Sequence, residues 1–166
     1  MPGRCLAFAN EIRLCHSPAM TAQPAARHGS FVHRLFYDEP AGAFSHGHIF
    51  VHAPDITDDQ RKPEIGYWHC DIAHGDRLAW SDKVYQLFGL PTGFPVDRNA
   101  ALARYSDVSK NALERVRSFA ISRKLGFILD ADISLGQGEI RWIRVLAIPI
   151  LSRGAVVAVH GLKRAL

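Results

Sequence analysis

The chain has few cysteines and no long apolar run. These absences argue against a disulfide-stabilised, a zinc-binding and a membrane-spanning protein. Its three cysteines, Cys5, Cys15 and Cys70, are an odd number at wide and irregular spacing. That pattern fits neither a disulfide framework nor the paired cysteines of a zinc site. No apolar stretch approaches the roughly 18 residues of a membrane-spanning helix, and Glu11 and Arg13 follow CLAFA too soon for a signal peptide. We therefore expect a cytoplasmic protein without a membrane segment.

Neither the basic nor the acidic residues are concentrated in one segment of the chain. The 20 Lys and Arg against 16 Asp and Glu give a formal net charge of +4 at pH 7 and a pI near 9.2. The arginines are spread over the whole length, whereas a nucleic-acid-binding tail has its basic residues in a block. With 48% apolar and 22% charged residues, the composition is that of a soluble folded chain. Nucleic acid is therefore not an expected partner, although a nucleic-acid-associated regulatory module stays open as an alternative function.

Residues 1–63 form a predicted N-terminal extension with two parts. Residues 1–30 hold small and polar residues without a sustained period and are predicted to be a flexible leader, in which Met20 is a second candidate for the true start. Residues 31–63 contain two segments of strand-like composition, around FVHRLFYD and HIFVHAP, and then one turn of helix. Pro63 ends that turn, so a domain boundary is expected there.

The pattern between residues 64 and 166 predicts a separate domain that begins with a β-hairpin. In YWHCDI, Trp68 and Cys70 alternate with polar neighbours, and Leu78 and Trp80 alternate again after the turn AHGD. Two alternating segments joined by a short turn are typical of two antiparallel strands.

Helices are predicted in the middle of this domain and strands at its end. Ser81 is expected to cap a short helix that ends near Gly89, and a longer helix is predicted over residues 107–124. Three segments with strand periodicity follow, FILDADIS, IRWIRVLAIPIL and AVVAVHGL, joined by the turns LGQGE and SRG. This order predicts an α+β domain in which helices cover one face of an antiparallel sheet.

Three sequence blocks within residues 64–162, about 60% of the chain, resemble the PAS family of sensor domains, most closely its fold-3 subtype. That subtype carries G-x-W-x-x-D, then W-S-x-x-x-Y-x-x-x-G, and later R-W before a hydrophobic residue. The matching positions, in the family's order and spacing, are Gly66, Trp68, Asp71, Trp80, Ser81, Tyr85, Gly89, Arg141 and Trp142. The resemblance implies a five-stranded antiparallel sheet of order 2-1-5-4-3, curved around helices, in a domain that is often dimeric through its N-terminal flank.

The chain departs from the family pattern in two places. Where the family has His-Pro-x-Asp at the start of the long helix, this chain has Tyr105-Ser106-Asp107-Val108. After the last strand it has GLKRAL instead of an Asp-Ile-Thr triplet that leads to an output helix. The family detects small molecules, light or redox state. Because no kinase, cyclase or DNA-binding domain follows the last strand, we expect the output to pass through another chain or through the N-terminal extension.

The cluster of reactive side chains between Trp68 and His74 is predicted to be structural. The strand's period of two sends His69 and Cys70 to opposite faces, whereas a Cys–His catalytic pair needs both groups within hydrogen-bond reach. Cys70 is therefore expected to be a small apolar residue on the concave face, with His69 and His74 exposed. No other nucleophile, phosphate-binding loop or carboxylate pair stands out, so neither a catalytic residue nor enzymatic activity is predicted.

Three histidines of the N-terminal extension are weak candidates for a metal site. His46, His48 and His52 share a parity, so in a strand they would face one way, as zinc ligands must. His33 would join them if the two strand-like segments pair. No carboxylate or thiol of matching parity follows closely, so no metal is predicted and a histidine-rich surface of unknown role is expected.

Bound cofactors of the PAS family require residues that this chain lacks. Flavin-binding light-oxygen-voltage domains use a reactive cysteine on the helix after the second strand, and no cysteine follows Asp71 here. Haem-binding members take an axial histidine from the helical region, and residues 75–159 contain none. No cofactor is therefore expected. A haem- or flavin-bound receptor stays open as an alternative, with haem held by His69, His160 or an N-terminal histidine.

A concavity lined by aromatic and aliphatic side chains is the remaining candidate site, unless these side chains only fill the core. The residues predicted to line it are Trp68, Cys70, Tyr85, Phe88, Val116, Ala120, Phe127, Leu129 and Ile148. Two alternatives stay open for Arg141: an ion pair with Asp71 or Glu139, or an exposed strand charge of little energetic weight. We therefore predict a bacterial-type sensory or protein-interaction module, expected to be a homodimer. It would couple small-ligand binding or dimer rearrangement to a separate signalling protein, a kinase or a regulator.

Overall fold

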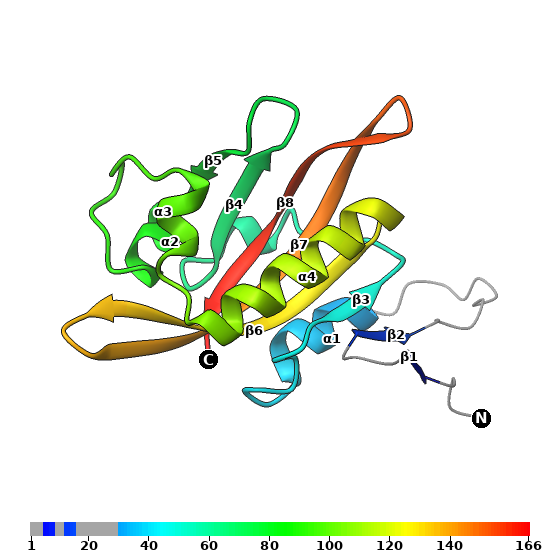
Figure 1. Ribbon diagram of the computed structural model, residues 1–166, viewed down its shortest axis with the longest axis horizontal. Helices are drawn as coiled ribbons and strands as arrows, with labels where there is room; N and C mark the ends of the chain where they lie inside the picture. Colours follow the sequence, from blue (N-terminus) through cyan, green and yellow to red (C-terminus); the bar gives the residue numbers. More distant parts are fainter. Residues whose placement is uncertain (1–4, 9–11, 16–29) are drawn as a thin grey trace.

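The computed structural model describes residues 5–8, 12–15 and 30–166, which form one large curved sheet with helices against it (Figure 1). Two short strands lie within residues 1–30, where the sequence predicts a leader without regular structure; the rest of that leader, Met20 included, lies outside the described residues. In chain order the elements are β1 (Cys5–Phe8), β2 (Ile12–Cys15), α1 (Phe31–Asp38), β3 (His48–Phe50), the 3₁₀ turn η1 (Asp59–Arg61), β4 (Gly66–Asp71), β5 (Arg77–Trp80), α2 (Asp82–Leu87), α3 (Arg98–Leu102), α4 (Asp107–Arg123), β6 (Gly126–Gly136), β7 (Glu139–Ser152) and β8 (Ala155–Ala165).

The last five strands have the predicted topology. The sheet runs β1-β2-β3-β6-β7-β8-β4-β5, so these five lie in the order β5-β4-β8-β7-β6, and every neighbouring pair among them is antiparallel. Numbered along the chain, this order is 2-1-5-4-3, which confirms the prediction. β4 and β5 form the predicted hairpin, in which Trp68 pairs with Trp80 and Cys70 with Leu78.

Within the described residues the sheet has eight strands rather than five, because the N-terminal extension continues it. β3 pairs antiparallel with β6 and aligns Ile49 with Phe127, so HIF joins the edge that β6 would otherwise leave open. β2 pairs parallel with β3, and β1 pairs antiparallel with β2. Only three residues of the strand-like segment HIFVHAP form a strand, since the chain bends at Val51 and His52.

The two helices predicted in the C-terminal part are present. α4 begins after Ser106, whose hydroxyl accepts a hydrogen bond from the Ser109 N–H at 3.2 Å. α2 begins after Ser81, but this serine makes no side-chain cap. Its hydroxyl instead accepts a hydrogen bond from the Tyr67 N–H at 2.9 Å, so Ser81 ties the start of α2 to β4.

Each face of the sheet buries its own apolar cluster. On the inner face, Phe127, Leu129, Val145 and Ala147 pack with side chains from α2, α3 and α4. The strand residues of the outer cluster are Phe50, Ile128, Leu146, Ile148 and Leu162, and they pack against α1. Helices therefore lie on both faces of the sheet, because α1 of the N-terminal extension covers the face that the predicted five-stranded domain would leave exposed. Burial on both sides accounts for the nearly continuous apolar run of β7.

Residues 31–38 form helix α1, so their prediction as a strand is wrong. Val32, Leu35 and Phe36 lie at i, i+3 and i+4, which places all three on one helical stripe, and all three are buried. Ser30 caps the helix by accepting a hydrogen bond from the His33 N–H at 3.3 Å. Aromatic and β-branched composition favoured a strand, but the spacing and the cap favour a helix, and packing on the sheet stabilises it.

A buried ion pair fastens α1 to the sheet. Arg144 on β7 and Asp130 on β6 have no exposed side-chain surface, and their two contacts measure 2.6 Å (Nε–Oδ1) and 2.8 Å (Nη2–Oδ2). The same guanidinium donates to the carbonyls of Leu35 at 3.0 Å, Glu39 at 2.8 Å and Pro40 at 2.8 Å. Arg144 thus satisfies carbonyls that the end of an eight-residue helix leaves without partners.

Replacing Arg144 alone is expected to destabilise the fold strongly. Arg144→Met leaves the buried Asp130 carboxylate without its counter-charge, so the free energy of unfolding measured in urea is expected to fall by about 3–5 kcal/mol. The double variant Arg144→Met/Asp130→Leu is expected to recover much of that loss, because no unpaired charge remains. Arg77→Met, at a side chain that is 72% exposed, serves as the control. A loss below about 1 kcal/mol for Arg144→Met would contradict this account.

Candidate ligand-binding site

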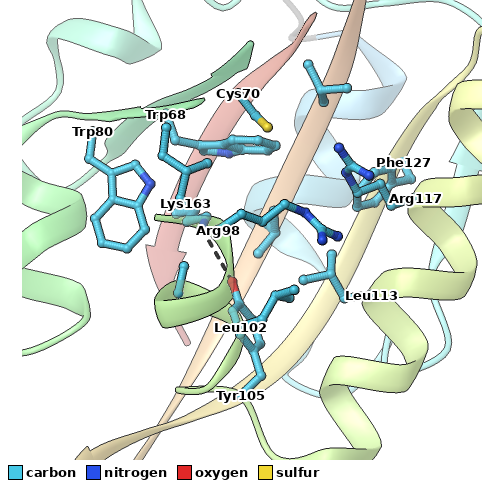
Figure 2. Close-up of a pocket in the computed structure, with 14 residues that line it drawn as sticks. Trp68, Cys70, Trp80, Arg98, Leu102, Tyr105, Leu113, Arg117, Phe127 and Lys163 are labelled. Atoms are coloured by element: carbon cyan, nitrogen blue, oxygen red, sulfur yellow. Dashed lines mark hydrogen bonds between the residues drawn. The ribbon is translucent and has the colours of Figure 1, made fainter. Parts of the chain in front are cut away.

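A cavity of about 60 Å³ lies between the inner face of the sheet and helices α3 and α4 (Figure 2). The hairpin β4–β5 supplies one wall, strands β6 to β8 supply the floor, and α3, α4 and the segment between them close the other side. The lining residues are Trp68, Cys70, Leu78, Trp80, Arg98, Ala101, Leu102, Tyr105, Leu113, Arg117, Phe127, Val145, Val159 and Lys163.

Three of the nine residues predicted to line a concavity, Trp68, Cys70 and Phe127, line this cavity. Four others, Phe88, Val116, Ala120 and Leu129, belong to the buried cluster on the same side of the sheet without lining the cavity. Tyr85 is half-buried, and its ring packs against Trp80 with the centroids 5.4 Å apart. Ile148 lies on the opposite face among Phe36, Leu146 and Leu162, so its predicted place at the concavity is wrong. A ligand-binding role for the lining residues stays a prediction.

Lys163, which the sequence analysis overlooked, is the central polar group of the cavity. It lies on β8 opposite Val145 and is only 6% exposed. The signal was present, because Lys163 shares its parity with Val159, and in a strand this places it on the same face. The sequence predicts a last strand that ends at Leu162, whereas β8 continues to Ala165.

Aromatic rings surround the Lys163 ammonium group. Its Nζ lies 4.7 Å from the ring centroid of Phe88, 5.2 Å from that of Trp68 and 5.4 Å from that of Trp80. Nζ donates a hydrogen bond to the Tyr105 hydroxyl at 3.3 Å (Figure 2). Ring faces stabilise a cation in part, but burial still lowers the pKa of Lys163 to about 7. A charge change near neutral pH is therefore built into the cavity.

The two tryptophans at the cavity have unused hydrogen-bond donors. The Nε1 atoms of Trp68 and Trp80 are buried and have no hydrogen-bond partner among the described residues. Figure 2 shows the Trp80 indole with its nitrogen turned toward Trp68 and Lys163. A buried donor without an acceptor costs about 1–3 kcal/mol, so each N–H is suited to an acceptor that a ligand would bring.

The other end of the cavity has a polar rim, formed by Arg98 and Arg117 with Asp76 and Glu114, in which the positive and negative charges are paired. Arg117 Nη2 donates to Asp76 Oδ1 at 2.7 Å, and Arg98 forms an ion pair with Glu114 and lies 3.9 Å from Asp76. The Cys70 thiol donates to Asp76 at 3.5 Å. Burial, together with the charge of Asp76, raises the pKa of Cys70. Cys70 is thus a protonated thiol, which is a poor nucleophile.

The remaining residues of the first hairpin have structural partners. Cys70 is buried whereas His69 is half-buried, in keeping with the alternation of β4. His74 is exposed, as predicted, and its Nδ1 lies 2.9 Å from an Asp71 oxygen. His69 is therefore less exposed than the sequence suggested, since β8 pairs it with His160.

Arg141 makes a contact that the sequence did not suggest. Its Nη1 donates to the carbonyls of Gln86 at 2.9 Å and Leu87 at 2.8 Å, at the end of α2. Of the two expected partners, Glu139 lies 3.6 Å away, and Asp71 is not among its contacts in the described residues. Arg141 therefore fixes the helix end against the sheet.

The N-terminal histidines do not form a common site. His48 is buried on β3, His52 is exposed at the bend that follows, and His46 lies in the preceding turn. His33, on α1, contacts the buried Asp59 at 2.6 Å instead of joining them. In the described part of the chain, no group of three histidine, cysteine or acidic side chains is placed to hold a metal ion. No helix there is long and apolar enough to cross a membrane.

The stability of the fold is expected to rise with pH because of Lys163. The folded-state pKa near 7 lies below the unfolded value near 10.4, so the unfolded chain binds the extra proton between these values. The cost of burying the charge is full below pH 7 and disappears as the pH rises. This one group adds up to about 1.4 kcal/mol per pH unit to the free energy of unfolding. Urea titrations from pH 7 to about 8.5 measure this slope. Above that range the Cys70 thiol, whose pKa is raised in the folded state, contributes a slope of the opposite sign.

The matched variants are Lys163→Met, which removes the titrating group, and Lys110→Met, which removes an exposed lysine of α4. Lys163→Met is expected to abolish the slope and to be more stable than the wild type at pH 7. Equal slopes in the two variants would show that Lys163 does not titrate near neutrality.

Solved structures provide the comparison with known proteins, since no family model and no curated protein matches the chain. An RNA-binding light-oxygen-voltage receptor matches 62% of this chain with a TM-score of 0.55 and 16% identity, and the match spans 29% of the receptor. The N-terminal domain of a diguanylate cyclase with PAS/PAC sensor from Marinobacter aquaeolei matches 61% of this chain and 94% of its own, with a TM-score of 0.56 and 14% identity.

A third similar structure is a domain of the putative light and redox sensing histidine kinase from Haloarcula marismortui. It matches 67% of this chain and 97% of its own, with a TM-score of 0.54 and 12% identity. Identities this low carry information about the fold alone. The three likenesses and the strand order β5-β4-β8-β7-β6 together confirm that the chain has the fold of PAS sensor domains.

Proposed function

We propose that the chain is a sensory module of signal transduction, which binds a small molecule in the cavity between the sheet and helices α3 and α4. The observation that carries the proposal is the buried Lys163, which shares this cavity with two unpartnered indole N–H groups. A cavity built only for packing would contain apolar side chains. Polar groups that stay buried without partners are instead typical of places where function outweighs stability.

The proposed output runs from the cavity to α1 through β8. Lys163 points into the cavity, and the next residue, Arg164, lies on the outer face. Arg164 donates to the carbonyls of Phe36 at 2.9 Å (Nε) and Tyr37 at 3.0 Å (Nη2), which lie in the last turn of α1. A ligand that moves Lys163 would therefore also shift the contacts of α1. Sensing would then be a population shift between two placements of α1.

The proposed partner is a separate signalling protein, a kinase or a regulator, and the chain itself is proposed to form a homodimer. The support is the set of proteins in which similar domains occur, a diguanylate cyclase and a histidine kinase. Ile140 and Trp142 on β7 offer exposed apolar surface for such contacts, at 62% and 42% exposure. The proposal includes no catalytic step, no cofactor and no nucleic-acid partner.

The proposal predicts that protein purified gently keeps a small molecule in the cavity. Native mass spectrometry is expected to show the chain with a small added mass in the wild type. Ala101→Leu fills the cavity from α3 and is expected to show the bare chain. Ala103→Leu adds the same atoms at an exposed position and is expected to behave like the wild type.

The same spectra give the oligomeric state, for which dimer masses are expected. An added mass with a visible absorption band would point to a haem- or flavin-bound receptor instead. Identical bare masses for the wild type and Ala101→Leu would contradict ligand binding in this cavity.

A further inference from the structure

The polar atoms in the inner part of the cavity are hydrogen-bond donors. A lysine ammonium group has three donors and no acceptor, and an indole nitrogen is a donor only. The Tyr105 hydroxyl is the nearest acceptor, and it already receives one hydrogen bond from Lys163. The N–H groups of Trp68 and Trp80 have no acceptor among the described residues. A molecule that satisfies these donors must itself present hydrogen-bond acceptors.

The charge around Lys163 is also incomplete. No carboxylate of the described residues lies within ion-pair distance of its Nζ. Asp76 at the rim is held by Arg117 at 2.7 Å and by the Cys70 thiol. Arg144 on the other face is equally buried but has Asp130 at 2.6 Å. A buried cation without its counter-charge is costly, so in its protonated form Lys163 is suited to an anionic partner.

We propose, as an extension of the proposed sensory function, that the cavity binds a short-chain aliphatic monocarboxylate. Its carboxylate oxygens accept hydrogen bonds from Lys163 Nζ and from the indole N–H groups of Trp68 and Trp80. Its alkyl chain packs against the apolar lining, which includes Leu102 and Leu113. The three donors and the one positive charge match the two oxygens and the one negative charge of a carboxylate.

The rim of the cavity disfavours a second carboxylate on the ligand. Arg98 and Arg117, the two other cations of the lining, are already engaged by Glu114 and Asp76. A dicarboxylate would have to break these ion pairs or bury a charge without a partner. A monocarboxylate leaves the rim as it is.

The size of the cavity limits the length of the alkyl chain. A single water needs about 10–15 Å³ of cavity volume, so about 60 Å³ accommodates roughly four to six non-hydrogen atoms. Acetate, propionate and butyrate fall within this range. Longer fatty acids exceed it.

The experiment titrates the full chain with butyrate and, as an isosteric neutral control, with butyramide. Tryptophan fluorescence and calorimetry report binding, because two of the three tryptophans line the cavity. Butyrate is expected to bind saturably, and butyramide at least tenfold more weakly, since it lacks the charge that Lys163 needs. Butylamine, which brings a second cation, is expected not to bind.

Two variants test the assigned donors. Lys163→Met is expected to reduce the affinity for butyrate by about 10- to 100-fold, the usual effect of a charged hydrogen bond. Trp80→Phe keeps a six-membered aromatic ring and removes the five-membered ring that carries the N–H, with an expected loss of about three- to tenfold. Lys110→Met, the exposed control on α4, is expected to bind like the wild type. Thermal unfolding of each variant in the absence of butyrate shows that it is folded.

Three results would overturn the monocarboxylate. They are equal affinity for butyrate and butyramide, unchanged butyrate affinity in Lys163→Met, and no saturable binding of acetate, propionate or butyrate. Butyraldehyde reduced onto Lys163 by borohydride, without carboxylate binding, would identify a carbonyl ligand that forms an imine with loss of water. In each case a small molecule that is retained by the wild type and absent from Ala101→Leu would leave the sensory function standing, whereas its absence removes that function as well.

Discussion

One buried guanidinium joins the N-terminal extension to the PAS-type sheet. Arg144 takes both oxygens of Asp130 from the neighbouring strand and, with its remaining N–H groups, the carbonyls around the end of α1. Desolvating such a pair is costly unless every hydrogen is used, and here the helix end provides the additional acceptors. The helix in turn depends on the sheet, because eight residues are too few for a stable isolated helix. α1 and the sheet therefore stabilise one another, and the extension is part of the folded unit.

The two faces of the sheet surround a buried cation in opposite ways: the outer face supplies a counter-charge, and the inner face supplies none among the described residues. On the outer face, Arg144 has a counter-charge and several carbonyls, so its burial is compensated within the chain. On the inner face, Lys163 contacts aromatic rings and donates a hydrogen bond to one hydroxyl. The two indole N–H groups beside it have no hydrogen-bond partner among the described residues. Because this fold pairs one buried cation completely, the stability of the fold does not explain why the other lacks a counter-charge. The inner face thus carries a cost in stability that a bound anion would remove.

Much of the fold follows from the sequence, but the site follows only in part. Periodicity and turns predict the five strands and α4, because each has a clear period and clear ends, whereas the order of the strands is what the resemblance to PAS domains implies. β7 is apolar at both parities, so alternation alone cannot tell which face receives Ile148, and a phase error of one residue misplaced it. The strand-like composition of FVHRLFYD hid its helical spacing. Lys163 was overlooked because a lysine beside the end of a chain is ordinarily solvated, and only the parity that it shares with Val159 marks it as inward.

Adjacent positions on β8 link the cavity to a helix on the far side of the sheet. A strand sends neighbouring side chains to opposite faces, so Lys163 reaches the cavity while Arg164 reaches Phe36 and Tyr37 at the end of α1. The backbone between them is held on both sides, with Lys163 paired to Gly66 on β4 and to Val145 on β7. In the proposed mechanism a displacement of the Lys163 backbone would therefore not be absorbed by a loop and would reach Arg164 directly. Arg144 binds carbonyls at the same helix end, so under the proposed function a ligand on the inner face would act on α1 through the hydrogen bonds of both arginines.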